Sequence, residues 1–522
     1  MNQKLFYFLL INLGISLSFF SCRTVQETVF AKETVPVSTS TASFDHGVAS
    51  GDPLNDRVII WTKVTPNTEE ILTVEWLVAT DKNMKTPIES GVVQTNQNVN
   101  YTVKVDVTGL NPNTTYYYQF KTLGTSSIIG RTKTTAKEGN DAVKLAIISC
   151  SNYEAGYYNA LARIAERTDI DAVVHLGDYI YEYGPGIYGD TTLGPNRKHL
   201  PAKEIIELSD YRTRYAQYRM DPDFQKVHQV HPFITIWDDH EFANNVYQSG
   251  AENHQSEEGA FADRSAAAKQ AYFEWLPVRE NTAQNIYRTI QFGEIVDLIL
   301  LDERIVGRTM PVDSATQINF KASDRSMLGA EQLAWFKGQL SESSATWKVI
   351  GNQVIFSLMD LSWRTPTSPY NLDAWDGYPY EQSNITQFLA TENITNTIFT
   401  TGDTHCSWAF EVPSDIVAYK ENPTNNSVAV EFGTPSITSA NFNESTPNAQ
   451  VLEAEKVFIH PNFNPHLKYV NLRDHGYLLL TLTKEETTAE WYYVDQIKER
   501  TSKEQMGKRY VVKSGSNKLY TE

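Results

Sequence analysis

Five apolar runs in the chain each end on polar side chains of types that bind metal ions. The runs are "VKLAIISC", "DAVVHLGDYIY", "FITIWDDHE", "WKVIGNQV" and "FTTGDTH". The candidate ligands at their ends are Cys150, Asp178, Tyr181, Asp238, Asp239, His240, Asn352, Gln353, Asp403 and His405. In open α/β sheets, ligands bind beyond the carboxyl ends of the strands, so we expect these side chains to meet on one rim. The pattern predicts a metal-dependent site.

The residue types narrow the chemistry further. Asp178 has two carboxylate oxygens and can bridge two ions, while the Tyr181 phenolate and the Cys150 thiolate both suit iron. Asp403 and His405 are two positions apart, so on an extended segment both would face one cluster.

Each candidate also has a purely structural interpretation. Cys150 could be a small buried apolar residue, Tyr181 could pack in a core, and His405 could be a core histidine with its hydrogen bonds satisfied. Asp238 and Asp239 are adjacent and on a strand would point to opposite faces, so we expect Asp238 only to orient the site. Five strand ends of the same kind favour the functional interpretation over these alternatives.

Other polar residues receive a structural interpretation. For Arg304, at the end of "LLDER", a surface salt bridge is preferred over a substrate contact. Cys406 would point away from the site if its segment is extended, and we expect His175 to lie inside a sheet. His46 and Asp52 belong to the N-terminal β region and are expected to be structural.

Composition excludes several classes of protein. The chain has 522 residues, 21% charged and 41% hydrophobic, which is typical of folded globular proteins. Its net charge of −18 argues against a protein that grips nucleic-acid phosphates with a basic face, and makes a dedicated nuclease a weaker alternative. Metal ions would supply the local positive charge that an anionic substrate needs.

The N-terminus predicts export. Lys4 precedes an apolar run over 5–20 that is short for a membrane span and fits a secretory signal. The run ends at Cys22, so residues 1–22 indicate a lipoprotein signal whose Cys22 is lipidated; an ordinary signal peptide is the alternative. Residues 23–43 are rich in Thr, Ser and Val and predict a tether. We expect a membrane-anchored lipoprotein, periplasmic or on the cell surface.

The rest of the chain divides by pattern. Residues 44–137 alternate with a strand period, and "GLNPNTTYYYQF" is typical of the corner of an immunoglobulin or fibronectin-III-like β-sandwich. Residues 142–497 alternate apolar strand runs with helical stretches, which predicts an α/β sandwich with sheets covered by helices. Residues 498–522 form a polar C-terminal extension.

Several motifs together resemble a known family. "FDHGVASGDPLNDRVIIWTKV", "ISCSNYE", "HLGDYIYEYG", "WDDHEFANN", "MLGAEQLAWF", "DAWDGYP" and "TGDTH" are similar to the alkaline phosphatase D family, within the calcineurin-like and purple acid phosphatase superfamily. The resemblance covers most of the chain after the tether. It implies a calcineurin-like metallophosphoesterase β-sandwich flanked by helices, with Fe³⁺ and Ca²⁺ as cofactors.

The resemblance also implies roles for single residues. The ferric ligands would be Cys150, Asp178, Tyr181 and His405, and Asp178 would bridge to a second site shared with Asp239 and Asp403. Oxygen-rich ligands at that second site favour calcium. Asn352 or Gln353 stands where purple acid phosphatases carry a histidine ligand. His240 would contact phosphate, and Asn245 would assist it.

The sequence therefore predicts an exported phosphatase that hydrolyses phosphate mono- or diesters through a metal-activated hydroxide. We expect small phosphate esters as substrates, a lipid anchor as the membrane contact, no nucleic-acid surface and a monomer. The alternative is a ligand-binding surface lipoprotein with an inactive phosphatase-like domain.

Overall fold

The computed structural model describes residues 40–365, 367–423 and 426–521. The predicted signal 1–22, its Cys22 and most of the predicted tether lie outside the described residues. In the part that is described, no helix is long and apolar enough to span a bilayer.

The first of two large sheets has nine strands, and it carries three of the predicted site segments. Strands β11, β12 and β13 are parallel neighbours at its centre, so their carboxyl ends meet at one edge. The order across this sheet is β23 (Glu504–Lys513), β22 (Glu486–Val494), β21 (Gly476–Leu482), β11 (Val143–Ile148), β12 (Ala172–His175), β13 (Pro232–Thr235), β2 (Val48–Gly51), β3 (Arg57–Lys63) and β7 (Thr102–Thr108).

The second sheet has seven strands and carries the other two site segments. Strands β15, β16, β17 and β19 run parallel. The order is β14 (Arg288–Phe292), β15 (Val296–Leu300), β16 (Trp347–Gly351), β17 (Thr397–Thr401), β19 (Ser427–Gly433), β18 (Ser407–Pro413) and β20 (Leu467–Asn471).

The two sheets face each other across one core. Side chains alternate along a strand, so Leu298 and Val349 join the core shared with the nine-stranded sheet, while Ile299 and Ile350 enter a second apolar cluster on the outer face. These strands read as continuous apolar runs because both of their faces are buried.

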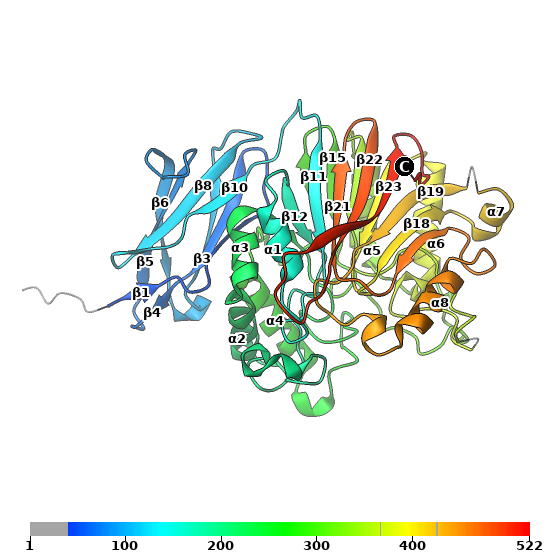
Figure 1. The fold of residues 1–522 in the computed structure, drawn as a ribbon, viewed down its shortest axis with the longest axis horizontal. Helices are drawn as coiled ribbons and strands as arrows, with labels where there is room; N and C mark the ends of the chain where they lie inside the picture. The colour runs from blue at the N-terminus through cyan, green and yellow to red at the C-terminus, as the bar shows by residue number, and fades with distance from the viewer. Residues whose placement is uncertain (1–39, 366, 424–425, 522) are drawn as a thin grey trace, which may run out of the picture. The chain divides into compact units, whose positions relative to one another are not determined.

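Helices cover the outer faces of the sheets (Figure 1). Buried side chains of α1 and α3 pack into the core of the nine-stranded sheet, and those of α5, α6 and α8 pack into the outer cluster of the seven-stranded sheet. The architecture is thus mixed α/β. The helices are α1 (Asn159–Glu166), α2 (Leu208–Arg219), α3 (Pro222–Val230), α4 (Phe261–Trp275), α5 (Gly329–Glu342), α6 (Pro379–Thr391), α7 (Ile416–Glu421) and α8 (Asn448–Phe458), with short 3₁₀ turns η1 (Gln97–Val99), η2 (Thr191–Leu193), η3 (Pro195–Arg197), η4 (Ser256–Glu258), η5 (Trp375–Gly377) and η6 (Phe442–Glu444).

The N-terminal β region shares one of its two sheets with the rest of the chain. Its own sheet contains β10 (Gly130–Lys133), β8 (Thr115–Thr122), β5 (Leu72–Ala79), β6 (Pro87–Thr95) and β9 (Thr125–Ser126), and β1 (Ala42–Ser43) pairs with β4 (Thr65–Pro66). Facing it are β2, β3 and β7, which end the nine-stranded sheet. The Tyr116 hydroxyl accepts the backbone N–H of Asn111 at 2.8 Å, a contact typical of the predicted sandwich corner.

A glycine permits the join between the two regions. Strand β2 pairs with β13 through Gly51 and Phe233. A Cβ atom at position 51 would lie 2.6 Å from the carbonyl oxygen of Phe233 and 2.4 Å from that of Pro277, so no side chain fits there. The predicted polar extension after residue 497 contains β23, which pairs with β22 and forms an edge of the same sheet.

Candidate metal centre and active site

Four of the predicted ligands lie just beyond strand ends with left-handed backbone. The φ angles are 59° at Cys150 after β11, 55° at Asp178 after β12, and 61° and 63° at Asp403 and His405 after β17. Left-handed φ costs roughly 1 kcal/mol or more for a residue with a Cβ, and such strain gathers at functional sites. Tight turns at three strand ends therefore aim these side chains.

The glycine of the "GD" motif brings two of these turns together. Gly177 has a φ of 106°, and a Cβ atom there would lie 2.4 Å from the Cβ of Asp238. Only glycine allows this approach. Asp178 and Asp238, which come from neighbouring strands, therefore reach the same cluster.

The four residues expected to bind the ferric ion lie together. Ligand atoms of Cys150, Asp178 and His405 all lie within 4.8 Å of one another. The Tyr181 hydroxyl lies 3.0 Å from Oδ2 of Asp178 and 3.5 Å from Nε2 of His405. Nδ1 of His405 lies 2.9 Å from the carbonyl oxygen of Ala440, which can only accept, so the lone pair of Nε2 is left for a ligand.

Two further groups continue the cluster. Ligand atoms of Asp178, Asp239 and His240 lie within 4.8 Å of one another, and so do those of Asp238, Asp239 and Asp403. Asp178 belongs to two of the three groups, and so does Asp239. Asp178 and Asp239 could therefore be shared between neighbouring cations.

Two expectations about side-chain direction are wrong. Asp238 and Asp239 do not point to opposite faces, because β13 ends at Thr235 and both acids lie in the following turn. Asp403 and His405 both reach the cluster, as expected, but from a turn and not from an extended segment, and they join different groups: Asp403 joins the Asp238 group and His405 joins the Cys150 group. The period-two argument fails because the strands end before the ligands begin.

The buried donor atoms fit cations. Oδ1 of Asp178, Oδ2 of Asp238 and Oε1 of Gln353 are buried and have no hydrogen-bond partner among the described residues. Burial raises the pKa of Cys150 and of Asp178 well above their ordinary values, because charge is costly away from water. Bound cations would satisfy these atoms and favour the anionic forms, so the thiol, phenol, imidazole and carboxylate donors suit an iron ion beside an oxygen-ligated ion.

Arg304 is not a surface residue, and the preferred sequence interpretation is wrong. Its side chain is fully buried and reaches the oxygens of three aspartates at 2.5 to 3.0 Å and of a fourth at 3.7 Å. These partners are Asp238, Asp373, Asp403 and Asp239. Arg308 adds a second buried arginine on Asp373. With Asp178, the cluster contains five carboxylates. Two arginines cannot neutralise all five, so bound cations would stabilise the cluster.

His240 is held by a carboxylate that the sequence analysis missed. Its Nδ1 lies 2.7 Å from Oε2 of Glu182, and Glu182 also accepts the Asn244 N–H and the Asn253 amide. Burial alone would lower the pKa of His240, but Asp239, Glu182 and Asp178 raise it well above its ordinary value. These three carboxylates therefore favour the protonated form of the imidazole.

The side-chain amides of Asn245 and Asn352, two further predicted site residues, form hydrogen bonds within the protein. The Asn245 side chain donates to Glu252, while its backbone N–H donates to Asp239 at 2.7 Å. Asn352 accepts from the Trp375 indole and donates to Thr401 and Val354, so its amide is committed to the protein.

Gln353 differs from its neighbour. Its amide nitrogen donates to the carbonyl oxygens of Trp237 and Leu301, and its oxygen is the unpartnered atom noted above. Of the two adjacent amides, Gln353 is the one with an oxygen available to a cation.

Glu241 and Glu303 also escaped the sequence analysis. Glu241 accepts backbone N–H groups of Asp178, Tyr179 and Asp238, which ties together the turns after β12 and β13. Glu303 accepts the N–H groups of Gln353 and Val354. Glu241 directly follows His240 in "WDDHEFANN", and Glu303 directly precedes Arg304 in "LLDER"; these positions were the available signals.

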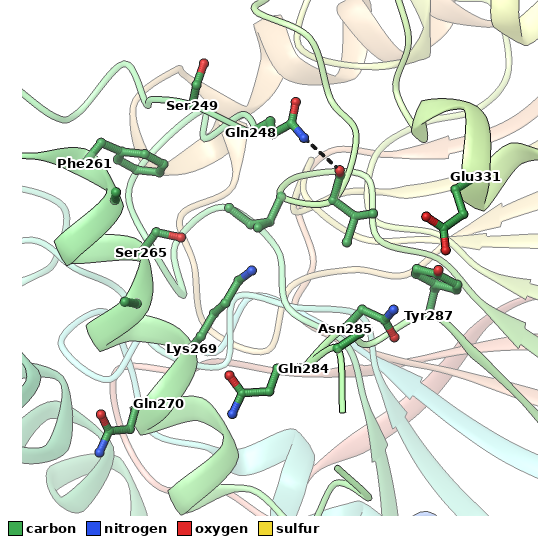
Figure 2. A pocket seen from close by; sticks show the side chains of 15 residues that line it. Gln248, Ser249, Phe261, Ser265, Lys269, Gln270, Gln284, Asn285, Tyr287 and Glu331 are labelled. Atoms are coloured by element: carbon green, nitrogen blue, oxygen red, sulfur yellow. Dashed lines mark hydrogen bonds between the residues drawn. The ribbon is translucent and has the colours of Figure 1, made fainter. Parts of the chain in front are cut away.

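Three hollows lie on or near the site. The largest, about 950 Å³, is rimmed by amides and contains none of the predicted ligands; Figure 2 shows Gln248, Gln270, Gln284 and Asn285 around it, with Lys269 and Glu331. A groove of about 420 Å³ includes Asp403, and a hollow of about 390 Å³ includes Asn245 and Asp373. The two smaller hollows therefore adjoin the cluster.

As expected, Cys406 and His175 are structural. Cys406 lies in the outer apolar cluster and is not in a disulfide with Cys150. His175 is buried in β12 with Nε2 3.1 Å from the Ser151 hydroxyl. Asp52 pairs with Arg288 at 2.6 Å, and His46 packs edge-on against Trp275.

Comparisons with known proteins identify the family of the chain. Residues 145–491 match the family model "PhoD-like phosphatase", and residues 30–136 match its "N-terminal domain" model. Alkaline phosphatase D of Bacillus subtilis (strain 168) is 36% identical over 476 residues, covering 87% of this chain and 78% of that protein. A solved structure described as "Structure of PhoD" superposes with a TM-score of 0.80 at 32% identity, covering 92% of each chain. The chain belongs to the PhoD-like phosphatase family.

Proposed function

We propose that this chain is an exported, metal-dependent phosphatase that hydrolyses phosphate mono- or diesters. The observation that carries the proposal is the buried cluster in which Asp178 belongs to two potential metal-binding groups and still has an unpartnered oxygen. Kinship with alkaline phosphatase D of Bacillus subtilis supports the reaction class. The facing sheets with helices outside are consistent with a calcineurin-like arrangement.

The donor set supports Fe³⁺ at one position and Ca²⁺ beside it. Cys150, Tyr181 and His405 would hold the iron together with Asp178, and Asp239 with Asp403 would supply oxygens to calcium. Gln353 is the further candidate for an oxygen ligand. When bound, such ions neutralise phosphate oxygens and lower the pKa of coordinated water.

The chain's own groups would complete the reaction. No hydrogen-bond partner occupies Nε2 of His240 in the described part of the chain, while Glu182 holds Nδ1. The imidazolium would therefore face the phosphoryl group and stabilise negative charge on a phosphoryl or leaving oxygen. Arg304 is surrounded by carboxylates, so we assign it to holding Asp238, Asp373 and Asp403 in place rather than to substrate.

Hydrolysis of p-nitrophenyl phosphate and bis-p-nitrophenyl phosphate at alkaline pH tests the reaction and ranks the two ester classes. We expect turnover of at least one ester and its loss in Asp178→Ala. A metal-loaded wild-type protein that turns over neither ester would refute the proposal.

The cellular location is a separate proposal. We infer that Cys22 is lipidated and anchors the protein to a membrane, from the apolar run that ends there. Metabolic labelling with a palmitate analogue should modify the wild type and leave Cys22→Ala unmodified. Equal labelling of the two would refute the anchor.

A further inference from the structure

The groove beside Asp403 is apolar along most of its length. Its volume is about 420 Å³, within the range of small-molecule sites. Asp403 and Thr404 form the end at the cluster, and the walls come from separate segments: the loop after β16, strand β18, η6 and helix α8. The main wall residues are Ile355, Met359, Leu361, Trp408, Phe442 and Phe458.

Three polar groups in this groove are already engaged in hydrogen bonds within the protein. The Trp408 indole donates to Oγ1 of Thr404 at 2.8 Å. The Asp376 carboxyl accepts the backbone N–H of Met359, and burial raises its pKa well above the ordinary value. The stretch of wall formed by Trp408, Met359 and Phe442 therefore offers few hydrogen bonds to a hydroxyl-rich ligand, and a polyol placed against it would lose bonds to water without replacing them.

A cation lies at the rim. Arg364 is exposed, its guanidinium lies 5.8 Å over the Phe442 ring, and no carboxylate forms an ion pair with it in the part of the chain that is described. An uncompensated positive charge here attracts an anionic ester and opposes a positively charged substituent on it.

The other hollows fit an apolar ligand less well. The hollow of about 390 Å³ contains the acidic side chains of Glu252, Asp313 and Asp373. The largest one, in Figure 2, is ringed by amides and shares no residue with the metal-binding groups. Of these three hollows, the groove is the one that joins the cluster to the aromatic side chains of Trp408, Phe442 and Phe458.

We propose that this groove binds an apolar alcohol arm, an aryl ring or an alkyl chain, of the phosphate ester whose phosphorus lies at the metal cluster. This substrate class rests on the proposed phosphatase function. The phosphate would lie by Asp403 and the arm would run along Trp408 and Met359 toward Phe442. Esters of apolar alcohols are thus preferred over esters of sugars or polyols.

Alkylphosphonates test this directly, because each has one phosphonate head and one arm. Their inhibition constants against p-nitrophenyl phosphate hydrolysis should fall about threefold to fourfold per methylene from methyl- to butylphosphonate, as expected for buried CH₂ groups. A phosphonate whose arm has the same length but carries hydroxyl groups should inhibit little better than methylphosphonate. Phe442→Ala and Leu361→Ala should each weaken butyl- relative to methylphosphonate by at least threefold.

A matched change in another hollow provides the control. Phe261 lines the hollow of Figure 2, so Phe261→Ala should leave the dependence on chain length as in the wild type. Inhibition independent of chain length, or equal effects of Phe261→Ala and Phe442→Ala, would overturn the inference while leaving the phosphatase intact. Absence of all turnover would overturn both together.

An isosteric pair tests the role of Arg364. 3,3-Dimethylbutylphosphonate should inhibit more strongly than its trimethylammonioethyl analogue. Arg364→Gln should reduce the difference between their two inhibition constants, and Lys269→Gln should leave it unchanged. Stronger binding of the cationic analogue would instead indicate recognition of a quaternary ammonium by the aromatic walls, and would overturn the assignment of an uncharged arm.

Discussion

Nδ1 of His240 lies 2.7 Å from Oε2 of Glu182, both side chains are buried, and His240 belongs to one of the candidate metal-binding groups. The two residues come from the loops after β13 and β12. Glu182 orients the ring and stabilises its positive charge, so it is a positioning residue that acts through His240.

This pair gives the first prediction. Glu182→Gln should lower kcat about 10- to 100-fold with little change in KM or in bound metal, because the charge that supports the imidazolium is lost. His240→Ala should lower kcat about 10²- to 10³-fold. In the His240→Ala background, Glu182→Gln should have no further effect on kcat. Additive losses would show that Glu182 does not act through His240.

The second prediction concerns the two kinds of cation position. Cys150→Ala should abolish iron binding and retain calcium, because Asp239 and Asp403 do not depend on the thiol. Elemental analysis of the purified variant measures both metals. Cys406→Ala is the matched control, since Cys406 is equally buried but lies in the outer apolar cluster. Loss of iron in both variants would point to general unfolding instead of a lost ligand.

Arg304 gives a prediction about stability. In metal-free protein, Arg304→Gln should lower the free energy of unfolding by about 3–5 kcal/mol, because buried carboxylates lose their counter-charge. Cations should reduce this deficit, since they neutralise the same oxygens. Urea unfolding with and without metal measures it, and Arg57→Gln, on a partly exposed pair, should cost under about 1 kcal/mol. If Arg304→Gln lost the same free energy of unfolding with and without metal, Arg304 and the cations would not neutralise the same carboxylates.

A buried histidine outside the candidate metal-binding groups predicts acid sensitivity. Burial lowers the pKa of His466 from 6.5 to about 4, and its Nε2 lies 2.7 Å from the Leu358 carbonyl oxygen. Between about pH 6.5 and pH 4 the histidine is protonated in the unfolded chain but neutral in the folded chain. The free energy of unfolding therefore falls as pH drops through this range, by at most about 3 kcal/mol. His466→Gln should flatten this pH dependence, and exposed His460→Gln should not. Identical profiles for wild type and His466→Gln would contradict the assignment.

The apolar runs that end in ligand-type residues were sufficient to predict which segments meet at the site. The direction of individual side chains was not predictable, since Asp238, Asp403 and His405 lie in turns where strand periodicity no longer applies. Arg304 was misjudged because an arginine's burial depends on distant carboxylates such as Asp373, which local sequence does not reveal.

The shared nine-stranded sheet was also beyond a sequence-based prediction. Strands β2 and β3 have the same alternating pattern whichever sheet they join. The pairing of β2 with β13 depends on the close approach at Gly51, a contact between residues far apart in the chain.

The central claim is that the cluster around Asp178 binds the metals on which hydrolysis depends. The most direct test is to remove metals from the purified protein with a chelator, then measure bound iron and calcium together with p-nitrophenyl phosphate and bis-p-nitrophenyl phosphate hydrolysis during reconstitution. The account predicts that hydrolysis disappears on chelation, returns in proportion to bound metal, and does not return in Asp178→Ala. Full activity in metal-free protein, or equal recovery in Asp178→Ala, would contradict it.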